Sequence, residues 1–258
     1  MLFWGLSIAS QACYRFHNFD KPSESSVVSK DPHMQSLSRQ VDTFVAACHE
    51  AAARGLLRCS SGNLSWRLGD GRMLVTRTRS WLGRLTGEDV AVCAIEDGAS
   101  LNGVTPTVEI RFHAGILRAR PDVNVVLHYQ SPHATALACR RRGSTNYFVI
   151  PEIPFYIGPI GQVPYLPPGS EELAEAVIEA MAGHDLAMMA NHGQVTVADD
   201  FDHALQNAEF FELACQIILA AGRDVKPLSD QAARPLLAQR AAANASRAPA
   251  DSFRLNRP

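Results

Sequence analysis

Residues 109–133, EIRFHAGILRARPDVNVVLHYQSPH, are the stretch that decides the fold. The stretch begins with the spacing of an amphipathic helix, breaks at residues 120–122, and continues as an apolar strand from Val123 to Leu127. His128 and Gln130 follow at the end of this strand. Because side chains two positions apart on a strand share a face, we expect the imidazole and the carboxamide to project together. Ser131 and Pro132 are typical of the start of a new helix.

A second imidazole lies in a similar setting further along the chain. The segment Asn191-His192-Gly193 follows another apolar run, Leu186–Met189. In α/β proteins, the ends of strands are where functional groups tend to gather. We therefore interpret His128 and His192 as two halves of one site.

The composition is that of a globular enzyme-sized chain. Of the 258 residues, 47% are apolar, which is enough to bury a sizeable core. The formal net charge of −2 and the absence of a long basic run argue against a nucleic-acid partner. Six cysteines are scattered without any CxxC pair, which favours reduced thiols over a disulfide framework or a zinc knuckle.

We expect three parts along the chain. Residues 1–35 are interpreted as a poorly ordered N-terminal extension, because the apolar run Leu2–Ala12 is too short to span a bilayer and lacks a basic leader sequence. Residues 36–222 are interpreted as one domain. Residues 223–258 are expected to form a C-terminal tail with a loose helix over residues 230–243. These features predict a cytoplasmic protein without a membrane partner.

Hydrophobic periodicity predicts alternating helices and strands within the domain. The predicted helices cover residues 36–54, 108–118, 132–141 and 171–181, and a long one begins at Asp200 or Asp202 and ends near residue 220. The predicted strands cover residues 63–67, 73–76, 90–95, 123–127, 147–150, 186–189 and 195–197. Because several of these strands are joined by short turns, we expect a mixed or mainly antiparallel sheet covered by helices.

Two polar loops are candidates for holding an anion. The turn Ser60-Ser61-Gly62-Asn63 offers backbone N–H groups and hydroxyls, although an ordinary polar turn accounts for it equally well. Arg77 and Arg79 follow the predicted strand at 73–76. These arginines are either solvated surface residues or partners of the turn that bind a phosphate or carboxylate bidentately.

Glu109 lies in the first turn of the helix predicted at residues 108–118, where a carboxylate is also favoured by the helix dipole alone. His113 lies four residues later on the same helix face. Two imidazoles suit a divalent transition metal such as zinc. Such an ion polarises a carbonyl or enediolate oxygen while a nearby carboxylate, here Glu109, moves a proton.

Together these motifs resemble the class II aldolase/adducin family in order and spacing, over roughly residues 40–222. The resemblance implies a three-layer α/β/α domain with a nine-stranded, largely antiparallel central sheet. It also implies a homotetramer with sites between subunits. The motifs that carry it are residues 60–63, Glu109 with 111–113, residues 120–124, His128 with Ser131, Ala134 and Ala138, and residues 191–193.

The resemblance also implies roles for individual residues. In the family aldolases, three histidines bind zinc and a glutamate acts as acid and base while a phosphorylated ketose is cleaved. Carried over by position, His128, Gln130 and His192 would bind the metal and Glu109 would be catalytic. The implied ion is divalent, with zinc first and iron, manganese or cobalt as alternatives. The substrate or phosphate pocket would contain Ser60, Ser61, Asn63 and Thr107, with Arg77 and Arg79 beside it.

Three positions depart from the family pattern. The family strand ends His-x-His, but here Gln130 stands in place of the last imidazole, and a neutral carboxamide is a weaker ligand for zinc. Arg77-Thr78-Arg79 replaces a Pro-Thr-Gly loop, and Thr107-Val108 replaces a Ser-Ser pair. His133 is an alternative third ligand, although it falls in the first turn of the next predicted helix.

Three functions remain open at this point. The first is a metal-dependent aldolase-type lyase acting on a small hydroxylated, phosphorylated or carboxylated substrate, with epimerisation or 3-oxo acid decarboxylation as related chemistry. The second is a non-catalytic, adducin-like binding module that has lost its metal. The third is an Fe(II)-dependent oxygenase on the same fold, which two histidines and a further ligand would suit.

Overall fold

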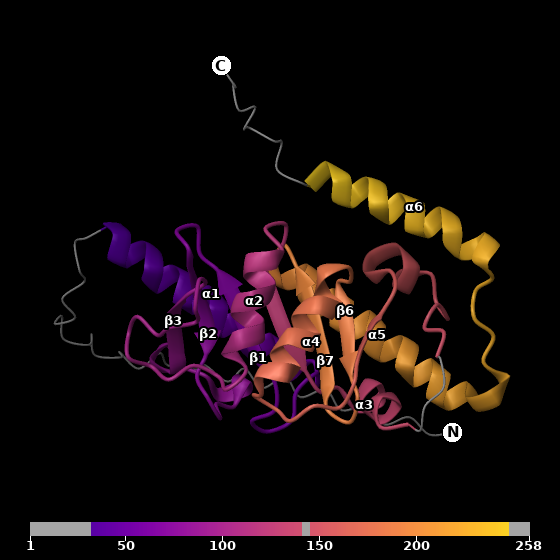
Figure 1. Cartoon of the computed structure of the whole chain (residues 1–258), viewed down its shortest axis with the longest axis horizontal. Coiled ribbons are helices and arrows are strands. Elements are labelled where there is room, and N and C mark those ends of the chain that lie inside the picture. The colour runs from indigo at the N-terminus through magenta and orange to yellow at the C-terminus, as the bar shows by residue number, and fades with distance from the viewer. Residues whose placement is uncertain (1–31, 141–144, 248–258) are drawn as a thin grey trace, which may run out of the picture.

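The computed structural model describes residues 32–140 and 145–247 of the chain (Figure 1). Within them one seven-stranded sheet has the strand order β3-β2-β1-β4-β7-β6-β5, and every neighbouring pair except β5–β6 is antiparallel. The largely antiparallel sheet is confirmed, with seven strands in the described residues rather than nine. The strands are β1 (Asn63–Arg67), β2 (Arg72–Thr76), β3 (Val90–Ala94), β4 (Val125–Tyr129), β5 (Gly161–Val163), β6 (Leu186–Met189) and β7 (Gly193–Ala198).

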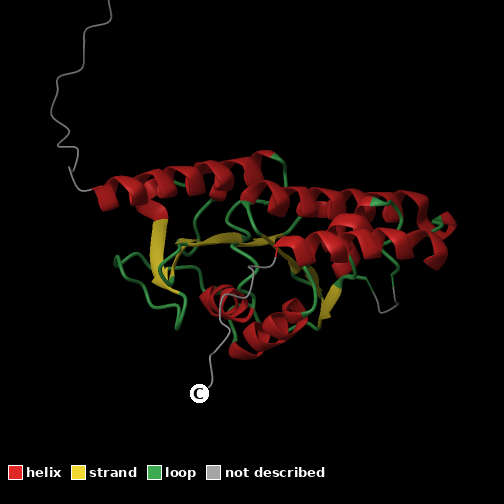
Figure 2. Ribbon diagram, turned by 90° about the horizontal axis from the view of Figure 1, so that it is seen from above, coloured by secondary structure: helices red, strands yellow, loops and turns green. Residues whose placement is uncertain are grey.

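Helices cover both faces of this sheet (Figure 2). The buried side chains of β2 and β4 alternate between two apolar clusters, because successive residues of a strand point to opposite faces. One cluster includes residues of α1, α3 and α5, and the other includes residues of α2 and α4. The three-layer α/β/α architecture is therefore confirmed. The helices are α1 (Pro32–Ala53), α2 (Ile110–Ala119), α3 (Pro132–Ala138), α4 (Glu171–Ala182), α5 (Phe201–Ala221) and α6 (Asp230–Arg247).

Most predicted elements are present, with boundaries that differ by a few residues, but the strand predicted at residues 147–150 is wrong. This segment has no strand; it precedes the π-helical turn Ile153–Ile157, and its backbone is bonded to the C-terminal part of the chain, with the N–H of Leu228 donating to Phe148 at 2.7 Å. An apolar run of this length is compatible with a buried strand and equally with an irregular connection that packs against the core.

The parts expected at the two ends are only partly described. Most of the expected extension at residues 1–35 lies outside the described residues, and α1 begins at Pro32. The helix predicted at 230–243 is α6, which ends at Arg247; residues 248–258 lie outside the described part. The described residues contain no helix long and apolar enough to cross a membrane.

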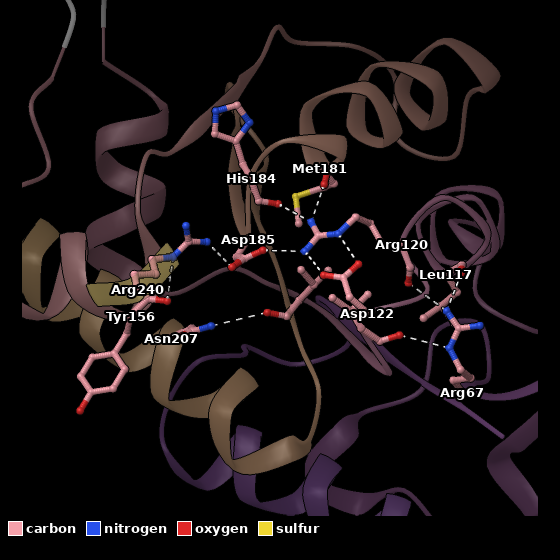
Figure 3. A network of polar contacts seen from close by, with 12 residues as sticks. Arg67, Leu117, Arg120, Asp122, Tyr156, Met181, His184, Asp185, Asn207 and Arg240 are labelled. Atoms are coloured by element: carbon pink, nitrogen blue, oxygen red, sulfur yellow. Dashed lines mark hydrogen bonds and ion pairs between the residues drawn. The ribbon is translucent and has the colours of Figure 1, made fainter. Parts of the chain in front are cut away.

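A polar network ties α6 to the sheet (Figure 3). Arg120 donates to both Asp122 and Asp185, at 2.7 and 2.9 Å, and to the backbone oxygen of Met181 at 2.9 Å. Arg240 of α6 donates to the other oxygen of Asp185. Asp185, at the start of β6, thus binds two guanidinium groups and holds α6 against the body of the domain.

A cavity of about 240 Å³ lies beside this network. Its lining includes both arginines, Asp185 and residues at the end of β7, so it lies at the opposite end of the strands from His128 and His192. Because the charged groups in this cavity pair with one another, it is a poor match for the predicted site.

Candidate functional site

The two predicted histidines lie next to each other in the structure. His128 is the fourth residue of β4, and His192 is the last residue of the turn that connects β6 to β7. Their rings are 5.0 Å apart, centroid to centroid, at an interplanar angle of 72°. They meet because β4 and β7 are neighbours in the sheet, with His128 paired with Val195.

The turn at Asn191 brings His192 into position. Asn191 has a φ of 54°, in the left-handed region that asparagine tolerates better than most residues. Its N–H donates to the backbone oxygen of Ala138 at 3.0 Å, which fixes the turn against the end of α3. The Asn191-His192-Gly193 segment therefore forms the turn and also presents the imidazole of His192 to the site.

Glu109 faces both imidazoles. Its Oε2 lies 3.5 Å from Nε2 of His128, and its Oε1 lies 3.5 Å from Nε2 of His192. Glu109 is the residue before the first turn of α2, yet its side chain makes no capping hydrogen bond there. The carboxylate thus points into the site instead of satisfying the helix, and the dipole explanation from the sequence does not account for its position.

The protonation of His128 follows from its other ring nitrogen. Nδ1 lies 2.9 Å from the backbone oxygen of Gln194, and because a carbonyl oxygen can only accept, Nδ1 must carry the proton. In the neutral ring, Nε2 then presents a lone pair toward the carboxylate of Glu109. A histidine whose second nitrogen donates to a backbone carbonyl is the usual arrangement of a metal ligand.

The carboxylate of Glu109 and the Nε2 atoms of two imidazoles face one another, an arrangement that a positive charge between them would stabilise. Glu109 Oε1 and His192 Nδ1 are buried and have no hydrogen-bond partner, which is costly for polar atoms. One ligand atom from each of Glu109, His128 and His192 lies within 4.8 Å of the others. Nitrogen and carboxylate oxygen ligands suit zinc and related divalent ions. The donor set present therefore fits a divalent metal.

Burial keeps His192 neutral. Desolvation, reinforced by the nearby His128, lowers the pKa of His192 to about 4, although Glu109 opposes the shift. Burial alone would raise the pKa of Glu109, but His128, the hydrogen bond from Asn63 and His192 together bring its pKa below the ordinary value. At neutral pH the site therefore contains an ionised carboxylate and an imidazole that is free to bind a metal.

Asn63 and His113 complete the surroundings of Glu109. The Asn63 amide nitrogen donates to Glu109 Oε2 at 2.8 Å, and the Asn63 oxygen lies 2.5 Å from Nε2 of His113. His113 is fully buried, and its Nδ1 lies 2.7 Å from the hydroxyl of Ser65. Sequence reasoning placed Asn63 only in an anion turn and gave His113 no role. The spacing of Glu109 and His113, four residues apart on a helix, was the signal that they share a face.

Gln130 borders the same space through its aliphatic carbons. A Cβ atom added to Gly193 would lie 2.8 Å from Cγ of Gln130 and 3.1 Å from Cε1 of His128, so both side chains flank this glycine. His133, the alternative ligand, turns the other way: its Nδ1 lies 2.7 Å from Glu212 of α5, whose carboxylate also accepts from the N–H of Ala134. His133 thus holds the start of α3 against α5.

The predicted anion-binding residues are distributed around the site. Ser60 is exposed, and the Ser61 hydroxyl accepts a hydrogen bond from Arg58 N–H at 3.0 Å. Gly62, with φ 78°, packs so closely on the end of β4 that an added Cβ would lie 2.6 Å from the His128 carbonyl oxygen. The turn therefore sits directly beside the proposed metal ligand.

Thr107 is buried beside Glu109, and its hydroxyl accepts from the Glu109 N–H at 3.3 Å. Arg77 and Arg79 lie on the loop after β2, next to this segment, because Arg77 pairs with Pro106 in an isolated β-bridge. Both side chains are exposed, and Arg77 lies 3.6 Å from Asp89. The structure therefore shows Arg77 beside Asp89 and gives no contact between either arginine and the Ser60–Asn63 turn.

Comparisons with known proteins agree with this geometry. The family model described as "Class II Aldolase and Adducin N-terminal domain" matches residues 42–219. A 3-oxo-tetronate 4-phosphate decarboxylase of Haemophilus influenzae is 33% identical over 187 residues, covering 71% of this chain and 89% of the relative. An L-fuculose phosphate aldolase of Methanococcus vannielii is 32% identical over 169 residues, covering 66% of this chain and 90% of the relative.

Solved structures share the fold. The crystal structure of YgbL from Escherichia coli, described as a candidate aldolase/epimerase/decarboxylase, superposes with a TM-score of 0.73 at 28% identity. The similarity covers 77% of this chain and 98% of YgbL.

Proposed function

The chain belongs to the class II aldolase/adducin family and is an enzyme of that superfamily, and from this we propose that it is a metal-dependent carbon–carbon lyase. Its substrate would be a small hydroxylated ketone or 3-oxo acid that carries a phosphate or carboxylate. The single observation that carries the proposal is the meeting of Glu109, His128 and His192, whose carboxylate and two Nε2 atoms face one another.

His128 and His192 would hold the ion through Nε2, and Gln130 would be the remaining protein ligand. A divalent ion at this point supplies stabilisation of the negative charge that develops on substrate oxygens as the carbon–carbon bond breaks. Zinc is the first choice because of the imidazole nitrogens, and Gln130 favours a harder ion such as manganese or iron as the alternative.

Glu109 would move the proton that the reaction requires. In aldol cleavage, a hydroxyl proton leaves one fragment as the bond breaks, and the carbon of the other fragment gains a proton. An ionised carboxylate that is held beside the two imidazoles is placed to accept the first proton and return the second. The hydrogen bond from Asn63 Nδ2 keeps this carboxylate facing the histidines.

The anion of the substrate would bind near the Ser60–Asn63 turn and Thr107. Gly62 places this turn against the end of β4, within reach of a substrate that spans from the metal point outward. Arg77 and Arg79, which extend from the neighbouring loop, would supply positive charge at the rim of the same pocket.

Decarboxylation of a phosphorylated 3-oxo acid is a second candidate reaction. It is favoured by the 33% identical decarboxylase relative, which aligns over 89% of its own length. In this reaction carbon dioxide leaves and the remaining carbon gains a proton, so Glu109 would be needed only to take up a proton from solvent and pass it to that carbon. In both reactions the two histidines would hold the ion that stabilises the negative charge on the substrate.

We also propose a homotetramer, in keeping with the family pattern. Val108, directly before Glu109, is 63% exposed. Large apolar side chains exposed beside a site are typical of a surface that another subunit covers. Light scattering of the purified protein would determine the number of subunits.

The decisive experiment loads the purified protein with zinc or manganese and offers it two panels of substrates. One panel contains phosphorylated ketoses, with aldehyde release as the measurement. The other contains phosphorylated 3-oxo acids, with carbon dioxide release as the measurement. Turnover in either panel that disappears with chelator supports the proposal, whereas a metal-loaded protein that is inactive in both contradicts it.

A further inference from the structure

Four buried side chains form one hydrogen-bonded chain that ends on Glu109. Asn63 and Ser65 lie on one face of β1, because they are two residues apart. Glu109 and His113 lie four residues apart at the start of α2 and share one helix face. Where the strand and the helix meet, the contacts run from Ser65 to His113 at 2.7 Å, from His113 to Asn63 at 2.5 Å, and from Asn63 to Glu109 at 2.8 Å.

The direction of each hydrogen bond is determined by its neighbours. Glu109 as a carboxylate can only accept, so Asn63 must present its amide nitrogen to it and its oxygen to His113. The oxygen of Asn63 also only accepts, so Nε2 of His113 must carry a proton. In a neutral ring Nδ1 then accepts from the hydroxyl of Ser65. Every donor in the chain is thus directed toward Glu109, an arrangement in which each bond polarises the next.

The hydrogen bond from the Ser65 hydroxyl to Nδ1 requires that the His113 ring is neutral. Burial, with a smaller contribution from His128, lowers the pKa of His113 to about 3, so the ring is uncharged near neutral pH. All four residues are at most 6% exposed, so water does not compete for these bonds. Reversing the Asn63 amide would place its oxygen against the Glu109 carboxylate and leave two buried acceptors facing each other, which is costly.

We propose that His113 is a positioning residue: it acts through Asn63 to hold the Glu109 carboxylate in the orientation that faces His128 and His192. Ser65 has a supporting part, because its hydroxyl donates to Nδ1 and so stabilises the His113 tautomer that carries the proton on Nε2. The expected loss of turnover rests on the proposed function. The expected change in geometry where Glu109 faces His128 and His192 does not depend on which substrate is turned over.

The test compares three variants of the full-length protein. His113→Leu keeps an apolar side chain of similar size but removes the donor to Asn63. His113→Gln is the matched control, because its amide nitrogen can reach the place of Nε2 and donate to Asn63. Ser65→Ala leaves the ring in place and removes only the hydroxyl that donates to Nδ1. Metal content and thermal unfolding are measured for each variant.

The kinetic result expected for His113→Leu is a fall in kcat of about tenfold to a hundredfold with KM nearly unchanged, since a small misplacement of a catalytic group has this effect. His113→Gln should recover most of the loss, and Ser65→Ala should fall between the two. A kcat for His113→Leu equal to that of the unmutated protein would overturn the proposal, and so would a His113→Gln variant as slow as His113→Leu. If His113→Leu fails to fold, Ser65→Ala takes its place in the test, and a kcat equal to that of the unmutated protein would then overturn the proposal.

A second measurement separates this inference from the proposed function. Protein loaded with Co²⁺ reports its ligand geometry in the visible absorption spectrum, without any substrate. We expect His113→Leu, or Ser65→Ala if the leucine variant does not fold, to shift this spectrum while His113→Gln preserves it. An unmutated protein that binds Co²⁺ but turns over no substrate would refute the lyase proposal and leave this result valid. Identical spectra in all variants would refute the positioning role.

Discussion

Nδ1 of His128 donates a hydrogen bond to the backbone oxygen of Gln194, 2.9 Å away across the β4–β7 pair. This bond fixes both the rotation of the ring and the nitrogen that carries the proton, so that Nε2 faces Glu109. A backbone carbonyl cannot change its protonation, and the strand that carries it is buried on both faces. His128 is thus prepared for a metal by the sheet itself.

Replacement of either histidine should remove the bound metal. His128→Ala and His192→Ala each remove one of the two nitrogen ligands, so we expect less than stoichiometric zinc by elemental analysis after purification without chelator. His203→Ala is the matched control: its ring lies 2.9 Å from Asp200 at the start of α5, in a separate acidic group. Loss of metal in the control alone would place the ion at α5 instead.

Glu109→Gln should separate metal binding from catalysis. Glutamine has the same shape as glutamate but cannot move a proton, so we expect kcat to fall by about a hundredfold or more. The fold should persist, and metal should remain because both histidines are unchanged. The measurement is kcat with the substrate identified from the panels, together with metal content. Undiminished turnover would remove Glu109 from the proposed mechanism.

Gln130→His should strengthen zinc binding. An imidazole is a better zinc ligand than a neutral carboxamide, and Gln130 flanks Gly193 together with the His128 ring. We expect affinity to rise about tenfold, corresponding to about 1.4 kcal/mol, in a competition titration against a chromogenic chelator. His133→Ala, which alters a ring that pairs with Glu212, should leave zinc affinity unchanged. Equal affinities for Gln130→His and the unmutated protein would show that Gln130 is not a ligand.

Acid should destabilise the protein through His113. The pKa of this ring is lowered to about 3 by burial, whereas the unfolded chain has a histidine with an ordinary pKa near 6.5. Below pH 6.5 the unfolded state therefore binds one more proton at this residue, and the free energy of unfolding falls as pH decreases, until the folded pKa is reached.

The expected contribution is about 1.4 kcal/mol per pH unit in this window. Urea unfolding of His113→Gln between pH 6.5 and 4 should therefore show a shallower pH dependence than the unmutated protein, by the equivalent of one proton. If the free energies of unfolding of the two proteins changed in parallel with pH, His113 would have the same pKa in the folded and the unfolded state.

Arg240→Ala should loosen α6 without affecting the site. Arg240 donates to Asp185, a contact that lies at the opposite end of the strands from His128 (Figure 3). Loss of a hydrogen bond to a charged group costs about 1.5–3 kcal/mol, so local detachment of the helix should become at least fivefold more frequent. Limited proteolysis between α5 and α6 should accelerate. Arg234→Ala, at an exposed position of the same helix, is the control. Equal cleavage rates would show that α6 is held by its apolar contacts alone.

Hydrophobic periodicity predicted a mixed or mainly antiparallel sheet covered by helices because it reports local structure directly, and the family resemblance implied the three layers. His128 and His192 were paired correctly, because each follows an apolar run whose end is marked by turn residues. The apolar segment at 147–150 misled the prediction, because its composition does not distinguish a strand from a packed connection. What separates the two is a contact with Leu228, far away in the chain.

The contacts around Glu109 were beyond prediction for a different reason. Asn63 has a second function as a hydrogen-bond donor to Glu109, and this depends on how β1 lies beneath α2. The acceptor to which His128 is bonded is a backbone oxygen, which has no residue-specific signature. The resemblance to a family identified the candidate site residues, but only their arrangement in space shows which of their atoms face one another.

Asn63, His128 and Val195 lie side by side on three adjacent strands, joined by the backbone bonds of the sheet. The position of His128 relative to Asn63 and to the start of β7, which His192 directly precedes, is thus set by the sheet before any ion arrives. Stripping an ion from this point should therefore leave an almost unaltered scaffold, which reloads without passing through an unfolded form.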